Sequence, residues 1–209
     1  MAITSPQVEL GRMSGAQFRR FQEGRPDHER WELVNGIPIM MVPPTLAHNV
    51  IASNLQRLLN EALMKHDRGR VALQRSGIEL GDDAGLGKDY RPEPDVVVLD
   101  AHFARGQRFI DRGYVLAEVV SDTDNEPVRG TGEPWIEVKR RLYLAHGPCE
   151  AVILIEPDRI EVRLDLRTPH GWRAAKLTRL DERLAIPTCG LHCLLADLYE
   201  MTPLRRHLP

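Results

Sequence analysis

Apolar side chains three or four positions apart mark the clearest helix of the chain. Over residues 46–66 an apolar stripe alternates with polar positions, which is typical of an amphipathic helix lying on a core. Two more helices are predicted. Ser14 is placed to cap a short one that ends near Gly24, and Pro134 opens another that runs from Trp135 to His146.

Shorter apolar runs predict the strands of a sheet. The arms Trp31–Val34 and Ile37–Val42 flank Asn35-Gly36, a pair suited to a type I′ turn because both of its central positions need positive φ. Two nearly continuous apolar runs, Asp95–Asp100 and Tyr114–Ser121, are typical of strands covered on both faces. The remaining predictions are strands at Val71–Leu80 and Ala151–Ile155, a second hairpin at Arg159–Asp165 and Trp172–Leu177, and a short helix after Leu191.

These elements follow one another in a mixed order, without internal repeats or low-complexity tracts. We therefore predict an α/β fold in which α-helices flank a mixed central β-sheet, with an N-terminal hairpin and a C-terminal hairpin added to it. A chain of 209 residues with 42% hydrophobic content fits a single domain over 1–209, with its core at roughly 46–156.

Two acidic residues stand in the two most apolar strands. If residues 101–112 simply turn the chain back, these strands pair antiparallel and Asp95 faces Glu118. Like charges directly opposite each other destabilise a sheet, and a buried unpaired carboxylate costs several kcal/mol. A bound divalent cation compensates for both. One alternative stays open, in which Asp95 caps a strand end after Pro94 while Glu118 pairs with a buried arginine.

A cation at this pair suits phosphodiester hydrolysis. Mg²⁺ prefers one or two carboxylates and leaves its other positions to water and substrate phosphate oxygens. The metal acidifies a bound water and offsets the repulsion between the acids and an anionic substrate. We therefore predict that Asp95 and Glu118 are catalytic ligands of Mg²⁺ or Mn²⁺.

One lysine is a candidate third member of this site. Of the 28 basic residues only four are lysine. Trp135, Lys139 and Tyr143 lie four residues apart, so they share a helix face that points inward or into a cleft. Lys139 is predicted to orient the attacking water or to stabilise charge on the phosphorane. The alternative is a surface lysine whose ammonium reaches the solvent.

An ordered series of motifs resembles the bacterial family of Uma-type “putative restriction endonucleases”, within the PD-(D/E)XK nuclease-like superfamily. The resemblance covers nearly the whole chain, up to residues 196–199. It rests on Trp31-Glu32-Leu33-Val34-Asn35-Gly36, Pro43-Pro44 with His48, Pro94-Asp95-Val96-Val97-Val98, Glu118-Val119-Val120-Ser121 and Lys139-Arg140-Arg141-Leu142-Tyr143.

The resemblance implies a restriction-endonuclease-like fold, a DNA substrate, and Asp95 and Glu118 as metal ligands. The lysine of the superfamily normally lies two residues after the second acid, where this chain has Val120, and Lys139 resembles the lysine that takes its place in Uma-type sequences. Glu32 and His48 match family positions and are accessory candidates, together with Tyr143. The alternative for Glu32 is a hairpin carboxylate with no role in the site, and the alternative for His48 is a residue that only lies near a helix N-terminus. The segment 122–133 departs from the family pattern by being longer and more acidic.

Composition limits the partners and the compartment. A formal charge of -2 gives no global basic field for a polyanion, so any DNA contact must be local. Three cysteines are too few for a disulfide framework, and the absence of a signal peptide or a long apolar run predicts a cytoplasmic protein that does not enter a membrane. A homodimer is expected from nucleases that cut both strands.

Two other groups of residues are candidate binding sites. Cys189, His192 and Cys193 fall within five residues, but zinc usually needs a second pair of ligands, so buried thiols are favoured. A second group is made of three arginines between the two acidic strands, Arg105, Arg108 and Arg112. They are candidates for phosphate contacts, but the default interpretation is that they are solvated loop residues.

The leading hypothesis is a metal-dependent endonuclease. The alternative is a nuclease-like fold that binds nucleic acid or a protein partner without cutting.

Overall fold

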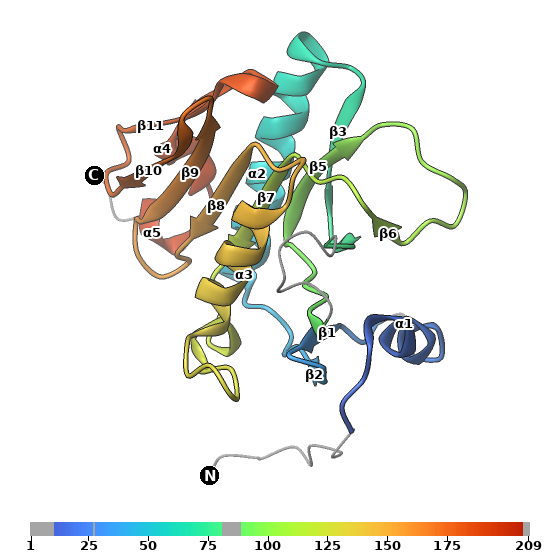
Figure 1. Cartoon of the computed structure of the whole chain (residues 1–209). Coiled ribbons are helices and arrows are strands. Elements are labelled where there is room, and N and C mark those ends of the chain that lie inside the picture. The colour runs from blue at the N-terminus through green and yellow to red at the C-terminus, as the bar shows by residue number, and fades with distance from the viewer. Residues whose placement is uncertain (1–10, 27, 81–88, 207–209) are drawn as a thin grey trace.

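A six-stranded mixed sheet forms the centre of the molecule (Figure 1). The computed structural model describes residues 11–26, 28–80 and 89–206. The parallel pair is β7 and β8, and every other neighbouring pair in this sheet runs antiparallel. The strand order is β10 (Gly171–Leu177), β9 (Val162–Thr168), β8 (Ala151–Ile155), β7 (Val115–Val119), β5 (Val96–Asp100) and β3 (Arg70–Gln74).

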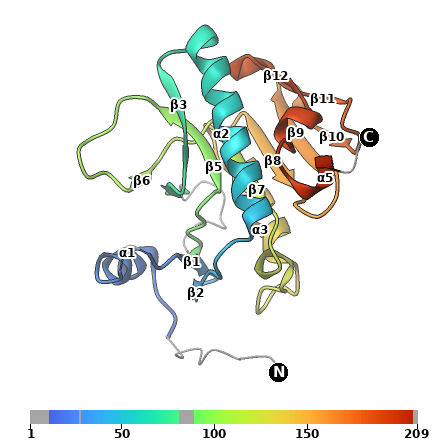
Figure 2. The ribbon, with the colours of Figure 1, turned by 180° about the vertical axis from the view of Figure 1, so that it is seen from behind.

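Two helices cover the two faces of the sheet, as the views from the front and from behind show (Figures 1 and 2). The long helix α2 (Leu46–His66) lies against one face, and α3 (Trp135–Ala145) connects β7 to β8 across the other. Side chains alternate along β5, because Val96 and Val98 pack with α2 while Val97 and Leu99 pack with α3. The predicted mixed sheet with flanking helices is confirmed.

The N-terminal elements pack at the end of the sheet where β5 begins. Ser14 and Gln17 form a capping box for α1 (Gly15–Glu23). A hairpin follows, made of β1 (Trp31–Val34) and β2 (Ile37–Met40). Its turn has φ of 48° at Asn35 and 76° at Gly36, as a type I′ turn requires.

The predicted strand at Val71–Leu80 is in fact two short strands that belong to different sheets. β3 ends at Gln74, and β4 (Gly77–Ile78) pairs in parallel with β6 (Phe109–Ile110). Between them Arg75 has a φ of 56°, which turns the chain out of the central sheet. The loose alternation of apolar and polar residues in this segment does not indicate the break between β3 and β4.

The C-terminal part differs from the prediction in two ways. The predicted hairpin is β9 with β10, and it extends the central sheet through β8 instead of forming an addition. Residues after Leu191 begin as a strand, β12 (Leu191–Leu194), which pairs with β11 (Arg183–Ile186). Leu191 and Cys193 are buried while His192 is exposed, so the period is that of a strand. Short helices come after it, α4 (Leu195–Leu198) and α5 (Pro203–Arg206).

The helices within the described ranges include none that is both long and apolar enough to span a membrane.

Candidate active site

The antiparallel register of β5 and β7 brings the two predicted acids together. Val96 pairs with Ala117, and continuing this register by one residue sets Asp95 opposite Glu118. Asp95 retains 5% exposure and Glu118 retains 1%. Glu118 lies on the same face of the sheet as Leu116 and Val120, which pack with α3, so its carboxylate points toward that helix.

Asp95 is held by three donors from three parts of the chain. Arg30 donates to Oδ1 at 3.0 Å, and the Oδ2 atom lies 3.0 Å from Nε2 of His48 and accepts from the backbone N–H of Val119 at 2.9 Å. Burial disfavours the charge of Asp95, but the contacts with His48 and Arg30 outweigh it and hold the pKa of this carboxyl well below its usual range. Asp95 is therefore a fixed negative charge.

Glu118 accepts from two residues of the same helix face. Nζ of Lys139 lies 3.2 Å from Oε2, and the hydroxyl of Tyr143 donates to Oε1 at 2.5 Å. Burial raises the pKa of Glu118 well above its usual value; Lys139 opposes this rise, whereas Asp95, Asp124 and Glu32 add to it. Burial beside these acids also raises the pKa of Tyr143, so the phenol keeps its proton and remains a donor.

Lys139 is enclosed by three carboxylates. Its Nζ lies 2.9 Å from Oδ1 of Asp124, 3.2 Å from Oε1 of Glu32 and 3.2 Å from Oε2 of Glu118. Its exposed fraction is 1%, so the surface alternative is wrong. Burial opposes the ammonium charge, but the surrounding acids outweigh burial and raise the pKa of Lys139 well above its usual value. Lys139 therefore stays protonated.

The accessory candidates Glu32 and His48 also reach this cluster. Glu32 comes from β1 and is fully buried; its Oε2 accepts from the indole N–H of Trp135 at 2.7 Å. His48 lies in the first turn of α2, where its backbone N–H is capped by Thr45, and its ring contacts Asp95. Glu32 is a hairpin carboxylate and His48 does lie near a helix N-terminus, as the alternatives stated, but each of them also contacts the site.

Two members of the cluster were not expected from the sequence. Asp124 lies in a 3₁₀ turn (Thr123–Asn125) of the acidic segment 122–133, and its Oδ2 accepts from both N–H and Oγ of Ser121. The Ser-x-x-Asp spacing at the end of β7 was the available signal for this turn. Arg30 precedes the hairpin and gave no signal, because its partner Asp95 is 65 residues away.

The cluster holds more acidic than basic side chains. Arg30 and Lys139 face four carboxylates, those of Glu32, Asp95, Glu118 and Asp124. A cavity of about 20 Å³ is lined by Arg30, Lys139 and three of the four acids, Asp95, Glu118 and Asp124, and it has room for about one water molecule or ion. Glu118 accepts two of the roughly four hydrogen bonds that a carboxylate takes, so it retains acceptor capacity.

This donor set fits a hard divalent cation. Its oxygens are carboxylate oxygens, and an added cation offsets the excess of acidic side chains. Across the described ranges, no group of three or more His, Cys, Asp or Glu side chains is arranged to hold a metal ion, so a cation here would have fewer than three such ligands. Mg²⁺ is usually bound by one or two carboxylates with several waters, which is the number that Asp95 and Glu118 provide.

The sequence over residues 16–194 matches the Uma2 family, described as “Putative restriction endonuclease”. The chain belongs to the Uma2 family. No curated protein matches the chain. Among solved structures, the chain is similar to a protein from Anabaena variabilis ATCC 29413 described as “a putative nuclease belonging to DUF820”, with 19% identity and a TM-score of 0.64 over 87% of this chain and 96% of that chain. At this identity the likeness shows a shared fold.

The cysteine cluster of this Uma2 chain lies on the α2 side of the sheet, opposite the face that carries Glu118. The thiols of Cys189 and Cys193 are buried in the α2-side core and contact backbone carbonyls, while His192 is exposed between them. This geometry favours buried free thiols over a zinc site. Arg112 lies 3.6 Å from Asp100, and Arg105 is exposed in the loop before β6.

Proposed function

We propose that this Uma2-family chain is a Mg²⁺- or Mn²⁺-dependent endonuclease that hydrolyses phosphodiester bonds of DNA. Membership of a family described as “Putative restriction endonuclease” supports nuclease activity. The cluster of buried acids, with its excess of acidic side chains, supports the requirement for a divalent cation.

The observation that carries the proposal is the position of Lys139. Val120 occupies the place where the superfamily has its lysine, and its side chain packs in the apolar cluster under α3. The ammonium of Lys139 nevertheless lies 3.2 Å from Oε2 of Glu118, although 21 residues separate the two in the sequence. A buried lysine whose ammonium lies within 3.2 Å of three carboxylates supports a catalytic role more strongly than a structural one, because an apolar side chain would fill the same space at a lower desolvation cost.

Asp95 and Glu118 would hold the cation, which supplies a bound water of lowered pKa and an electrophile for the phosphate oxygens. Lys139 holds a positive charge in a fixed position, so it would orient the attacking water and stabilise the negative charge that builds on the phosphate. Tyr143 fixes the carboxylate of Glu118, and Arg30 with His48 fixes that of Asp95. In the reaction, the attacking water releases one proton to solvent and its oxygen bonds to phosphorus, one P–O ester bond breaks, and the released strand end takes a proton from solvent.

The test is DNA cleavage with Mg²⁺ or Mn²⁺ and with EDTA. We expect cleavage that requires the metal and falls on the order of 10²-fold or more in Asp95→Asn, Glu118→Gln and Lys139→Met. Asp122→Asn is the matched control, because Asp122 is an exposed acid in the same segment as the buried Asp124. Equal activity of Asp95→Asn, Glu118→Gln and Asp122→Asn would contradict the proposal.

A protein that binds DNA but leaves it uncut with either metal would instead support the alternative of a non-cleaving binding module.

A further inference from the structure

A second cavity, of about 390 Å³, lies beside the candidate active site. Its volume is in the range of roughly 300–1,000 Å³ that is typical of pockets enclosing a small ligand. Glu93 is part of its wall, and the backbone of Glu93 donates to Glu32 and accepts from Arg30. Two residues later the same segment reaches Asp95, so the cavity and the acidic cluster share a wall.

Arg75 lines this cavity in an uncommon backbone conformation. Its φ is 56°, and such values are rare for residues other than glycine and gather at functional sites. The β3–β5 register pairs Gln74 with Val96, so Arg75 follows at the end of the sheet where Asp95 lies. The turn at Arg75 therefore places this residue in the same cavity wall as Glu93, whose carboxylate the Arg75 charge stabilises.

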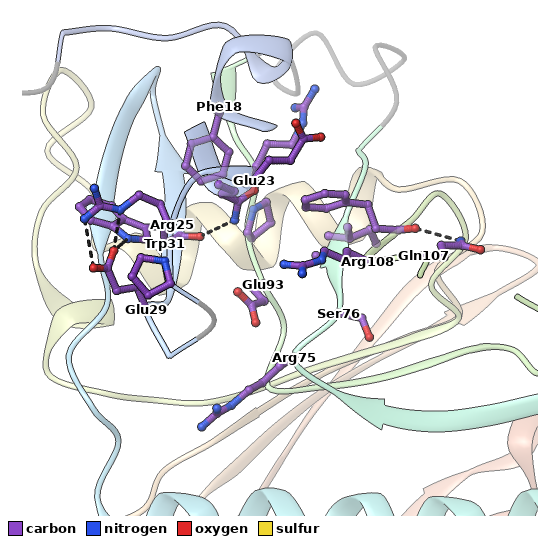
Figure 3. A pocket seen from close by; sticks show the side chains of 17 residues that line it. Phe18, Glu23, Arg25, Glu29, Trp31, Arg75, Ser76, Glu93, Gln107 and Arg108 are labelled. Atoms are coloured by element: carbon purple, nitrogen blue, oxygen red, sulfur yellow. Dashed lines mark hydrogen bonds and ion pairs between the residues drawn. The ribbon is translucent and has the colours of Figure 1, made fainter. Parts of the chain in front are cut away.

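The guanidinium of Arg75 is available for an anion. Its side chain is exposed, and within residues 11–26, 28–80 and 89–206 no ion pair or hydrogen bond engages it. Other arginines of the lining are engaged, since Arg25 pairs with Glu29 and Arg91 with Glu79. Figure 3 shows Arg75 and Ser76 along one side of the cavity and Glu93 between them and the opposite wall.

The opposite wall carries an aromatic ring and a guanidinium, two groups suited to a nucleobase. The guanidinium carbon of Arg25 lies 5.2 Å from the ring centroid of Trp31, and Glu29 fixes both residues by accepting from the guanidinium and from the indole N–H. Figure 3 shows these three side chains together. Unstacked bases are commonly received on aromatic rings and on arginine planes.

We infer that this cavity binds one unstacked nucleotide of the DNA substrate, with Arg75 on its phosphate and the Arg25–Trp31 wall against its base. The inference rests on the proposed function and deepens it by naming the substrate class. A base inside an intact duplex is stacked and paired, so its face reaches the Arg25–Trp31 wall only after it is extruded. The preferred substrate is therefore single-stranded or locally unpaired DNA.

The test is fluorescence anisotropy with a labelled oligonucleotide, offered as a single strand and as its duplex, with Ca²⁺ in place of Mg²⁺. The single strand is expected to bind about tenfold more tightly than the duplex. Arg75→Ala is expected to weaken single-strand binding about fivefold to tenfold and to reduce the slope of log K against log salt concentration by about 0.7. The matched control is Arg173→Ala, an exposed arginine on β10 at the far edge of the sheet.

A second variant tests the cavity itself. Ser76→Trp fills the space without removing a charge, and is expected to abolish the preference for the single strand, whereas Ser76→Ala keeps it. Equal binding of duplex and single strand, or Arg75→Ala behaving as Arg173→Ala does, would overturn the inference. A folded Arg75→Ala variant decides the question if Ser76→Trp does not fold.

The two proposals fail separately. If DNA is cut in a metal-dependent way but Arg75→Ala and Ser76→Trp bind the single strand as wild type does, only the nucleotide site is wrong. If no DNA is cut but Arg75→Ala weakens single-strand binding selectively, cleavage is wrong and the nucleotide site stands.

Discussion

At the scale of single residues, the site is governed by buried charges that depend on one another. Lys139 balances acids that come from β1, from the end of β7 and from the turn at Asp124. Removing one partner of a buried ion pair leaves an uncompensated charge, which costs more than the pair contributed. Each substitution in the cluster therefore changes both stability and chemistry, and matched controls are needed to separate the two.

Lys139→Met should lower the free energy of unfolding by about 3 kcal/mol at neutral pH in EDTA, because three carboxylates lose their common cation. Urea unfolding measures this change. Arg141→Met is the control on the same helix, since Arg141 is 42% exposed and pairs with Glu133 at the surface, where an ion pair contributes about 0–1 kcal/mol. Equal stability of the two variants would contradict a buried charged lysine.

The raised pKa of Glu118 predicts a dependence on pH. A folded-state pKa above the unfolded value means that the native state binds more protons, so wild-type stability falls as pH rises above about 4.3 toward the raised pKa. Glu118→Gln lacks this ionisation. In metal-free buffer, the melting temperature of the variant relative to wild type should therefore increase from pH 5 to pH 8, as measured by thermal unfolding. A constant difference across this range would show that Glu118 does not titrate abnormally.

Residue patterns predicted part of the site. Asp95 and Glu118 followed from the assumed register, which the structure confirms, and the inward direction of Lys139 followed from its helical spacing with Trp135 and Tyr143. Arg30 was not predictable, because its contact with Asp95 depends on how the N-terminal segment folds back onto β5. Local sequence carries no information about such a long-range pairing.

At the scale of elements, the β1–β2 hairpin and α3 form a joint wall of the site. The indole N–H of Trp135 donates to Oε2 of Glu32, and its ring stacks on Tyr90 with centroids 5.8 Å apart. The hairpin turn was predicted correctly because Asn35-Gly36 specifies it locally. The break at Arg75 and the strand β12 were missed, since both depend on pairing partners that are distant in the sequence.

Trp135→Phe tests this junction. The variant removes the N–H and leaves a buried carboxylate oxygen of Glu32 with one donor fewer, so we expect a loss of about 1–3 kcal/mol in unfolding free energy. Trp172→Phe is the control, because Trp172 is half-buried on β10 and contacts the Arg167 guanidinium with its ring face. A loss in Trp135→Phe no larger than in the control would show that the junction contributes little.

At the scale of the whole molecule, the site lies where several parts of the fold meet. The ends of β5 and β7, the first turn of α2, the face of α3 and the N-terminal hairpin all contribute to it. A ligand at this point contacts the native arrangement and has no equivalent site in the unfolded chain. Binding of a cation should therefore stabilise the whole fold.

Thermal unfolding with Mn²⁺ measures this linkage. At about 100 times its dissociation constant, a ligand adds about 2.7 kcal/mol, which for a chain of this size corresponds to a rise of roughly 5–10 °C in melting temperature. Wild type and Asp122→Asn should show the rise, and a variant carrying both Asp95→Asn and Glu118→Gln should not. The same rise in the double variant would place the stabilising cation elsewhere.

The central claim is that Asp95 and Glu118 share a divalent cation beside Lys139. The most direct measurement is an anomalous difference map at the manganese absorption edge, from crystals soaked in Mn²⁺. The account predicts a peak that bridges the two carboxylates at about 2.0–2.3 Å from their oxygens, in the cavity that both acids line. A soaked crystal with no peak at these carboxylates, or with manganese bound only at other acids, would contradict it.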